Sequence, residues 1–285
     1  IKIYSIGNNS DLTYPYVNLG SNTTIIKQII DGSNKIYEKL KNSKKPMIII
    51  GESALYGDAG QYIFEALKQF LYKNNFIRKD WNALNILTQQ ASRVGAIDLG
   101  IYSINDKENF LFFDKLNNDE FKLLYLLGAD NINFDKKEKF IIYQGSHGDK
   151  GAEIADIILP GAAYTEKNGL FVNLEGKIQN AYKASYPPGE ALEDWVIFKK
   201  LANIMKKPLG YTNIKSLRES ISKFFESKNN NILKKSTNIK FIDSEISIKP
   251  NDYYYSNPIA RSSKTMSECR AISKKFLFTG IEKAS

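Results

Sequence analysis

Short continuous apolar runs alternate with stretches of helical periodicity along the first 160 residues of the chain. The runs lie at residues 46–51, 122–127, 141–143 and 156–159. Such a run is typical of a strand that a parallel sheet buries on both faces, and we expect this of residues 46–51 in particular. Strands alternating with helices of these lengths predict an α/β fold with a mostly parallel sheet flanked by helices.

Helical spacing is clearest directly after the first of these runs. Asp58 is expected to cap a helix whose apolar stripe covers residues 62–71 at nearly 3.6-residue spacing. Asp80 is expected to cap a second helix, and residues 22–40 have a helical pattern that Gly32 interrupts. The apolar positions of the helix expected after Asp80 are Trp81, Leu84, Leu87, Ala91 and Val94.

A hairpin is expected to break this alternation. Residues 170–179 have the pattern of two short strands around a tight turn, in which Gly176 can take a positive φ. Further helices are expected to begin at Asp194 and to cover residues 214–225. Residues 228–250 are rich in Asn, Lys and Ser, which indicates a variable surface connection.

The composition is that of an ordinary globular protein. The 285 residues are 42% hydrophobic and 25% charged, enough for one large or two small domains. No apolar run approaches the 18 residues of a membrane-spanning helix, and the N-terminus has no signal-peptide pattern. We therefore expect neither a transmembrane helix nor a signal peptide. The net charge of +9 comes from scattered lysines, and the abundance of Ile, Lys, Asn, Tyr and Phe suggests an AT-rich, mitochondrial genome. We therefore expect no nucleic-acid partner.

The cysteine and histidine counts limit the redox chemistry of the chain. Cys269 is the one cysteine and His147 the one histidine. Iron–sulfur clusters typically need four thiolates, and zinc sites need several Cys or His ligands. The chain therefore cannot build either site alone, and it cannot form an internal disulfide.

Residues 140–179 have a spacing of the form ADxxLPxxxxxExxGxxxNxEGxxQ. The matching positions are Ala155, Asp156, Leu159, Pro160, Glu166, Gly169, Asn173, Glu175, Gly176 and Gln179. This spacing resembles that of the molybdopterin oxidoreductase superfamily. Within the superfamily it resembles the C-terminal part of the 75-kDa iron–sulfur subunits of respiratory complex I. Residues 252–269 and four shorter runs resemble the same subunits, at residues 44–51, 81–87, 96–100 and 126–130.

The resemblance implies the superfamily fold, with a hairpin insertion and a helical C-terminal tail. It divides the chain into four segments. These are an N-terminal segment, a Rossmann-like α/β domain, a molybdopterin oxidoreductase-type segment with the hairpin, and a helical and extended tail, at residues 1–45, 46–145, 146–205 and 206–285.

The resemblance also implies a scaffold role in the peripheral, NADH-oxidising arm of NADH:ubiquinone oxidoreductase. The iron–sulfur clusters would lie in the N-terminal half of the subunit or in a partner chain, and this chain would be a split-gene product or a fragment. Its partners would be that cluster-binding half and the flavoprotein subunits, on the matrix side of the mitochondrial inner membrane. We expect no catalytic, cofactor-binding or metal-binding residue in this chain, no nucleic acid and no membrane insertion.

Two other functions stay open. One is a fragment of a catalytic molybdopterin oxidoreductase, of the formate dehydrogenase or nitrate reductase type. The other is a free nucleotide-binding Rossmann-like module, which the absence of a GxGxxG motif makes the weaker hypothesis.

Two glycine-rich loops are candidate ligand sites. Residues 51–60 lie between a strand and a helix, but their glycine spacing fits no phosphate-binding motif, and we predict a structural turn. Residues 145–151 follow a strand at the sheet edge where α/β folds bind ligands, and they include His147, Asp149 and Lys150. The resemblance places the pterin cofactor of catalytic relatives near this loop, and we favour a vestigial loop here.

The remaining polar candidates have local structural explanations. His147 is interpreted as a hydrogen-bonded structural residue rather than a general base. Three acidic residues have expected roles in strand termination, loop anchoring and turn formation, namely Asp156, Glu166 and Glu175. Cys269 is expected to be a packed, unreactive thiol. The tyrosine-rich residues 252–266, with Arg261, suit either a protein interface or a segment that wraps its own domain.

Overall fold

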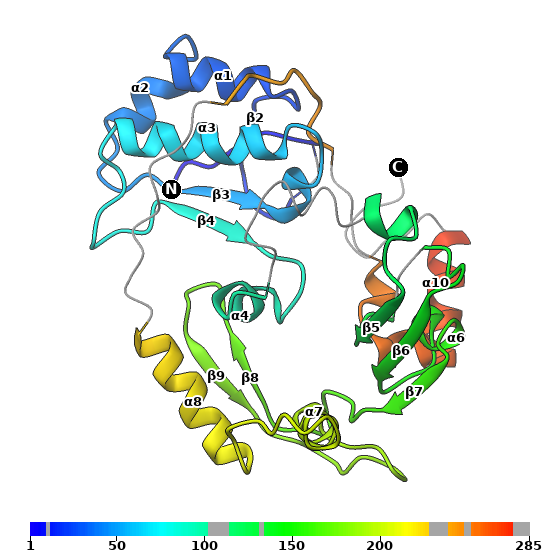
Figure 1. Ribbon diagram of the computed structural model, residues 1–285. Coiled ribbons are helices and arrows are strands. Elements are labelled where there is room, and N and C mark those ends of the chain that lie inside the picture. The colour runs from blue at the N-terminus through cyan, green and yellow to red at the C-terminus, as the bar shows by residue number, and fades with distance from the viewer. Residues whose placement is uncertain (10–11, 102–113, 131–133, 228–238, 248–251, 276–285) are drawn as a thin grey trace. The chain divides into compact units, whose positions relative to one another are not determined.

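The computed structural model describes residues 1–285 apart from 10–11, 102–113, 131–133, 228–238, 248–251 and 276–285 (Figure 1). Contacts between residues divide the chain into two compact units. Unit 1 comprises Ile1–Arg93, Ile232–Tyr253 and Ser273–Ser285, and unit 2 comprises Val94–Asn231 and Tyr254–Ile272. The four segments expected from the sequence stay a prediction, since they are continuous along the chain and the units are not.

Unit 1 combines two pairs of parallel strands with helices. Its strands are β1 (Tyr4–Ser5), β2 (Val17–Asn18), β3 (Ile48–Gly51) and β4 (Leu84–Leu87), and β1 pairs with β2 and β3 with β4. Its helices are α1 (Thr24–Asp31), α2 (Ile36–Lys41), the 3-10 turn η1 (Glu52–Leu55) and α3 (Gly60–Lys73). Gly32 ends α1 with a φ of 86°, which confirms the predicted interruption.

The core of unit 1 is apolar and centred on α3. The predicted stripe of this helix is buried throughout, with Phe70 and Leu71 at 1% and 0% exposure. It packs with the buried residues of α1, β3 and β4 in one hydrophobic cluster. Figure 1 shows α1 and α3 on the same side of the β3–β4 pair.

Three sequence predictions for unit 1 are wrong. Asp58 does not cap α3, because Ala59 occupies the N-cap position and makes no side-chain cap. The helix expected after Asp80 is instead strand β4, whose Leu84 and Leu87 pair with Ile48 and Gly51 of β3. The β3 strand is not buried on both faces, because Ile49 is 54% exposed.

Of the surface connection expected at residues 228–250, residues 228–238 and 248–250 lie outside the described ranges, and part of the described remainder packs into the core of unit 1. The ring of Phe241 lies 5.2 Å from that of Tyr62 on α3, and Ile246 belongs to the buried cluster. The backbone N–H of Thr23 donates to the Ser244 carbonyl at 3.0 Å, and the Thr23 hydroxyl donates to the Ile242 carbonyl at 2.7 Å. This segment therefore completes the core of unit 1 from a distant part of the sequence.

Unit 2 contains a three-stranded parallel sheet in the order β5-β6-β7. Its strands are β5 (Leu123–Leu127), β6 (Phe140–Gly145), β7 (Ile157–Pro160), β8 (Gly169–Val172) and β9 (Ile178–Ala181). The helices that lie wholly or mostly in unit 2 are α4 (Arg93–Asp98), α6 (Lys150–Glu153), α7 (Asp194–Ile204), α8 (Ile214–Ser227), η2 (Tyr253–Tyr255), α9 (Pro258–Ser262) and α10 (Lys264–Lys275).

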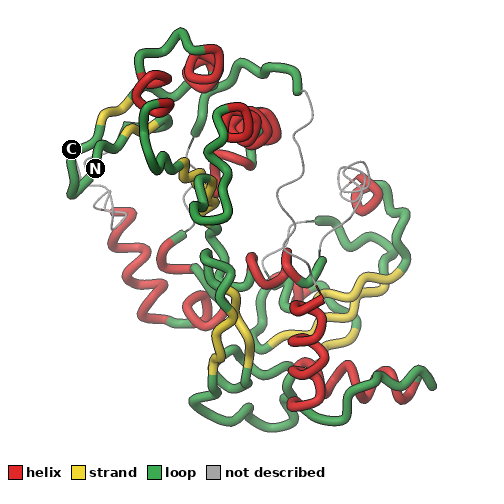
Figure 2. Tube along the Cα trace, turned by 90° about the vertical axis from the view of Figure 1, so that its left-hand side faces the viewer, coloured by secondary structure: helices red, strands yellow, loops and turns green. Residues whose placement is uncertain are grey.

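The predicted fold class is confirmed. Strands β8 and β9 form the expected antiparallel hairpin, with Gly176 at a φ of 79° in its turn. The tube in Figure 2 shows the short strands separated by helices and long loops. No helix within the described ranges has both the length and the apolar character needed to cross a bilayer.

Candidate functional site at the carboxyl ends of the three-stranded sheet

The carboxyl ends of β5 and β6 carry the best candidate site. The two strands run in parallel with Leu127 opposite Gln144, so the loops that follow them leave the same edge of the sheet. The loop after β5 supplies Asp130, and residues 145–151 run from the last residue of β6 through the loop into the first turn of α6. Open α/β sheets bind ligands at this edge.

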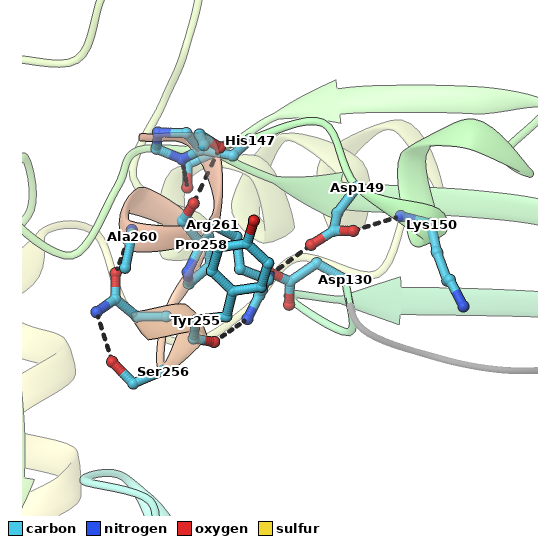
Figure 3. A network of polar contacts seen from close by, with 12 residues as sticks. Asp130, His147, Asp149, Lys150, Tyr255, Ser256, Pro258, Ala260 and Arg261 are labelled. Atoms are coloured by element: carbon cyan, nitrogen blue, oxygen red, sulfur yellow. Dashed lines mark hydrogen bonds and ion pairs between the residues drawn. The ribbon is translucent and has the colours of Figure 1, made fainter. Parts of the chain in front are cut away.

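Arg261 occupies this edge from a distant part of the sequence. Its Nε donates to Oδ2 of Asp149 at 2.6 Å, and Nη2 donates to Oδ2 of Asp130 (Figure 3). Nη1 also donates to the carbonyl of Tyr255 at 3.3 Å. The three charged side chains are only 11–24% exposed, so little water screens these pairs. We call Arg261, Asp130 and Asp149 the arginine clasp.

Local capping fixes the position of Arg261. Asn257 caps α9 by accepting a hydrogen bond from the Ala260 N–H at 3.0 Å, and Pro258 follows at the first helical position. The Tyr255 ring lies 4.4 Å beneath the Arg270 guanidinium, and the Tyr255 hydroxyl contacts Ser267 at 2.9 Å. The tyrosine-rich segment thus wraps its own unit, which supports the second of the two alternatives left open by the sequence.

Tyr143 fills the space beneath the clasp. Its hydroxyl donates to the His147 carbonyl at 3.0 Å, and its side chain is almost fully buried. Burial, followed by the charges of Asp130 and Asp149, raises the pKa of the Tyr143 phenol to about 12. The phenol therefore stays protonated as a hydrogen-bond donor at neutral pH.

Two of the three loop glycines make room for this tyrosine. A Cβ at Gly145 would lie 2.2 Å from the Tyr143 hydroxyl oxygen, and a Cβ at Gly151 would lie 2.7 Å from the Ala129 carbonyl oxygen. Only Gly148 has open space in place of its missing side chain. The glycine spacing that suggested a ligand loop mainly permits close packing of the chain against itself.

His147 has its hydrogen-bond partner within the loop, and Asp149 has one there and one in the C-terminal segment. Nδ1 of His147 lies 2.9 Å from the Ser146 hydroxyl, in agreement with a hydrogen-bonded structural histidine. Asp149 caps α6 by accepting from the Lys150 N–H at 2.9 Å while its second oxygen binds Arg261.

The other acidic candidates lie apart from the clasp in local contacts. Asp156 accepts from the Ile141 N–H at 2.8 Å and from Lys136 at 2.6 Å, and the hydrogen bond from Lys136 lowers the pKa of its carboxyl. Glu166 accepts from the Ala163 N–H at 2.9 Å. Glu175 accepts from the Asn173 side chain at 3.4 Å in the hairpin turn. These contacts agree with the predicted structural roles.

The prediction for Cys269 is wrong, because its side chain is exposed on α10. The helix around it follows the sequence expectation, but its thiol lies on the outer face.

The loop at residues 51–60 contains η1, and Gly60 packs so closely that a Cβ there would lie 2.1 Å from the Leu55 carbonyl oxygen. This loop is a packed structural turn, as predicted.

A second polar cluster was missed by the sequence analysis. The buried Gln144 donates to Oδ1 of Asp194 at 2.8 Å and accepts from the Tyr125 hydroxyl at 2.5 Å. Lys167 pairs with Oδ2 of the same Asp194. Burial and, to a lesser extent, Asp194 raise the pKa of Tyr125. A glutamine inside an otherwise apolar strand was the available signal, since a buried polar group needs partners.

Two family models match the chain. The model described as molybdopterin oxidoreductase matches residues 1–204, and a model of the C-terminal region of the G subunit of NADH-ubiquinone oxidoreductase matches residues 220–269. The chain belongs to the molybdopterin oxidoreductase family. The resemblance inferred from residues 140–179 is therefore confirmed.

Similar proteins align over nearly the whole chain. The NADH-ubiquinone oxidoreductase 75 kDa subunit of Reclinomonas americana is 39% identical, over 96% of this chain and 41% of that protein. The G subunit of the NADH-quinone oxidoreductase of Rickettsia conorii is 38% identical, over 94% and 40%. The mitochondrial NADH-ubiquinone oxidoreductase 78 kDa subunit of Candida albicans is 34% identical, over 94% and 38%. The chain spans about two fifths of the length of these relatives.

The carboxyl edge of the three-stranded sheet does not fit the molybdopterin that the family name implies. Two carboxylates and one guanidinium meet there, so the clasp carries a net charge of −1. An anionic pterin phosphate would be repelled by this charge, and each of the three nitrogens of Arg261 already donates to Asp130, Asp149 or Tyr255. The arrangement stabilises the position of the C-terminal segment.

Proposed function

We propose that this chain is the C-terminal, non-catalytic portion of the 75-kDa component of respiratory complex I, NADH:ubiquinone oxidoreductase. It acts as a scaffold in the peripheral arm and holds the electron-carrying parts of the 75-kDa component in place. The observation that carries the proposal is similarity over 94–96% of the chain to three relatives that are named as 75 kDa, G or 78 kDa subunits of NADH-ubiquinone or NADH-quinone oxidoreductases.

The C-terminal family match distinguishes this proposal from a catalytic alternative. Residues 220–269 match a model specific to the G subunit of NADH-ubiquinone oxidoreductase, and this region includes Arg261 of the clasp. A fragment of a formate dehydrogenase or nitrate reductase gains no support from the names of the relatives. The poor fit of the clasp to a pterin also favours the scaffold role.

The proposal extends to cofactors, partners and location. One cysteine and one histidine are too few for an iron–sulfur cluster, so the clusters belong to the rest of the subunit or to a partner chain. The partners are that cluster-binding part and the flavoprotein subunits. The location is the matrix side of the mitochondrial inner membrane, in line with the mitochondrial relative from Candida albicans.

Co-purification tests the proposal. Membranes from the source organism, solubilised in mild detergent and separated on a native gel, should show this chain in the band that oxidises NADH. Mass spectrometry of the band should also identify a polypeptide, or a continuation of this one, with the cluster-binding cysteines. Recovery of the chain only outside the NADH-oxidising band would reject the proposal.

A substitution in the isolated enzyme tests the scaffold role. His147→Ala should leave the rate of NADH oxidation largely unchanged, because the His147 side chain hydrogen-bonds to a neighbouring serine of the same loop. A loss of several orders of magnitude in turnover with normal assembly would instead assign His147 to the chemistry.

A further inference from the structure

Strand β5 is an apolar strand at the edge of its sheet. Its sequence is Leu-Leu-Tyr-Leu-Leu, and among the described residues β6 is its one neighbouring strand. Leu123 and Leu127 are 57% and 50% exposed. Edge strands of native proteins normally carry charges, prolines or bulges that prevent pairing with another chain. None of these lies within β5, so its outer edge is suited to pairing.

The hydrogen-bond pattern identifies the backbone groups on this edge. Phe140 N–H donates to the Lys122 carbonyl, and Gly128 N–H donates to the Gln144 carbonyl. Backbone groups alternate in direction along a strand, so the even-numbered residues of β5 face β6. The N–H and C=O groups of Leu123, Tyr125 and Leu127 therefore point to the outer edge.

The length of the relatives indicates what pairs there. About three fifths of the length of each relative lies outside the region that aligns with this chain. Sheets most often have about four to six strands, and an apolar edge without charges, prolines or bulges is open to pairing with a further strand. The remaining part of the same subunit is long enough to supply both a strand and its crossover helix.

We propose that the outer edge of β5 pairs with an apolar strand from the rest of the subunit. This is the part that the relatives contain in addition to the region that aligns with this chain. This inference rests on the proposed function and names the surface by which the scaffold joins the rest of the subunit. The added strand would satisfy the outward backbone groups of β5, and with its crossover helix it would cover Leu123 and Leu127.

Amide hydrogen exchange tests the pairing without any substitution. In the assembled NADH-oxidising enzyme, the amides of Leu123, Tyr125 and Leu127 should exchange about 100-fold more slowly than in the chain alone. The amides of Leu124 and Leu126 already face β6 and serve as internal controls. Equal exchange of the outward amides in both states would overturn the proposal.

Two edge variants and a matched control test the surface directly. The binding partner is a polypeptide made of the region of the Reclinomonas americana 75 kDa subunit that does not align with this chain. Leu123→Pro removes an outward N–H at the first residue of the strand, where proline is tolerated, and Leu127→Lys places a charge on the edge. Each should weaken binding by about tenfold or more, while Ile158→Lys on β7, where Ile158 is 53% exposed, should not.

The outcomes separate this inference from the proposed function. If the chain co-purifies with NADH oxidation but both edge variants bind as tightly as the control, the β5 surface is wrong and the function stands. If the chain alone forms a dimer that Leu127→Lys dissociates, a second copy occupies the edge and the proposal is also wrong. Absence of the chain from the NADH-oxidising enzyme would reject the function itself.

Discussion

The two units use the same strand and helix pattern and both bury some polar side chains, but unit 1 has a large apolar cluster where the sheet of unit 2 has the arginine clasp at its edge. In unit 1, β3 and β4 pack on α3 through a cluster of buried apolar side chains. In unit 2, the buried residues of the parallel sheet and its loops include Gln144, Lys139 and Asp130, each with a polar or charged partner. Apolar periodicity alone therefore does not reveal what stabilises a sheet.

The difference has physical consequences. Apolar burial is insensitive to pH and weakly dependent on salt, and its loss scales with the volume removed. Buried ion pairs contribute little net stability when intact, but removal of one partner leaves an uncompensated charge. Unit 1 should be vulnerable to truncation of large side chains, and unit 2 to loss of a single charge.

Each unit contains one tryptophan, which allows the two to be followed separately. Trp81 lies in unit 1 and Trp195 in unit 2. Replacing one of them by phenylalanine leaves fluorescence that reports on the other unit, and urea titrations then give separate free energies of unfolding. The following predictions use these backgrounds.

The largest effect is expected from Phe70→Ala in unit 1. Phe70 is 1% exposed and its ring contacts those of Tyr37 and Phe76. The substitution should lower the free energy of unfolding by about 3–5 kcal/mol, measured through Trp81. The control Ile49→Ala, at a side chain 54% exposed, should cost below about 1 kcal/mol. A similar cost for both variants would show that unit 1 has no dominant apolar core.

The second largest effect on the free energy of unfolding is expected from Arg261→Met in unit 2. It removes the partner of both Asp130 and Asp149, and we expect a loss of about 2–3 kcal/mol, below the range for fully buried pairs because some water reaches the site. The matched control is Lys264→Met, which removes a 3.9 Å pair with Glu268 whose side chains are 92% and 61% exposed. That control should cost at most about 0.5 kcal/mol. Equal effects through Trp195 would contradict a buried clasp.

The alkaline pH dependence of unit 2 should depend on Tyr143. Its pKa is about 12 in the folded protein, against an ordinary value near 10. The folded state therefore retains a proton that the unfolded state loses, and the associated stability is fully present below pH 10 and lost as the pH rises toward 12. Tyr143→Phe has no phenol to titrate, so in urea titrations at pH 9–12 the parent should lose stability relative to the variant as the pH rises from 10 toward 12. A parallel decline in both proteins would contradict it.

The smallest effect is expected at Cys269. Because its thiol is exposed on α10, a thiol reagent should label the native protein almost as fast as the urea-unfolded protein. Cys269→Ser should change the free energy of unfolding by less than about 0.5 kcal/mol. Protection of the thiol by more than tenfold in the native state would show that α10 presents another face to solvent.

The sequence predicted elements whose signal is local. The α3 stripe, the β5, β6 and β7 runs and the hairpin at Gly176 were all found, because periodicity and turn chemistry act over a few residues. Strand β4 was mistaken for a helix, since Leu84 and Leu87 are three residues apart and fit either pattern. Pairing with β3 decided between them.

The candidate site was predicted only in part. The loop after β6 was identified, but its main contact, Arg261, lies 112 positions from Asp149 and 131 from Asp130. No short-range pattern connects residues so far apart. The glycines made this loop a candidate ligand site, for which a vestigial loop was favoured, and the structure shows that Tyr143 occupies the space at Gly145.

The sequence by itself determined the family, the α/β alternation and the lack of enough sulfur and imidazole ligands for a cluster, because spacing and counts need no coordinates. Only the tertiary structure decided which acidic residues meet Arg261, that residues 239–246 complete a core, and that β5 presents an apolar edge. These features depend on contacts between distant residues, whose energies come from burial and charge pairing in three dimensions.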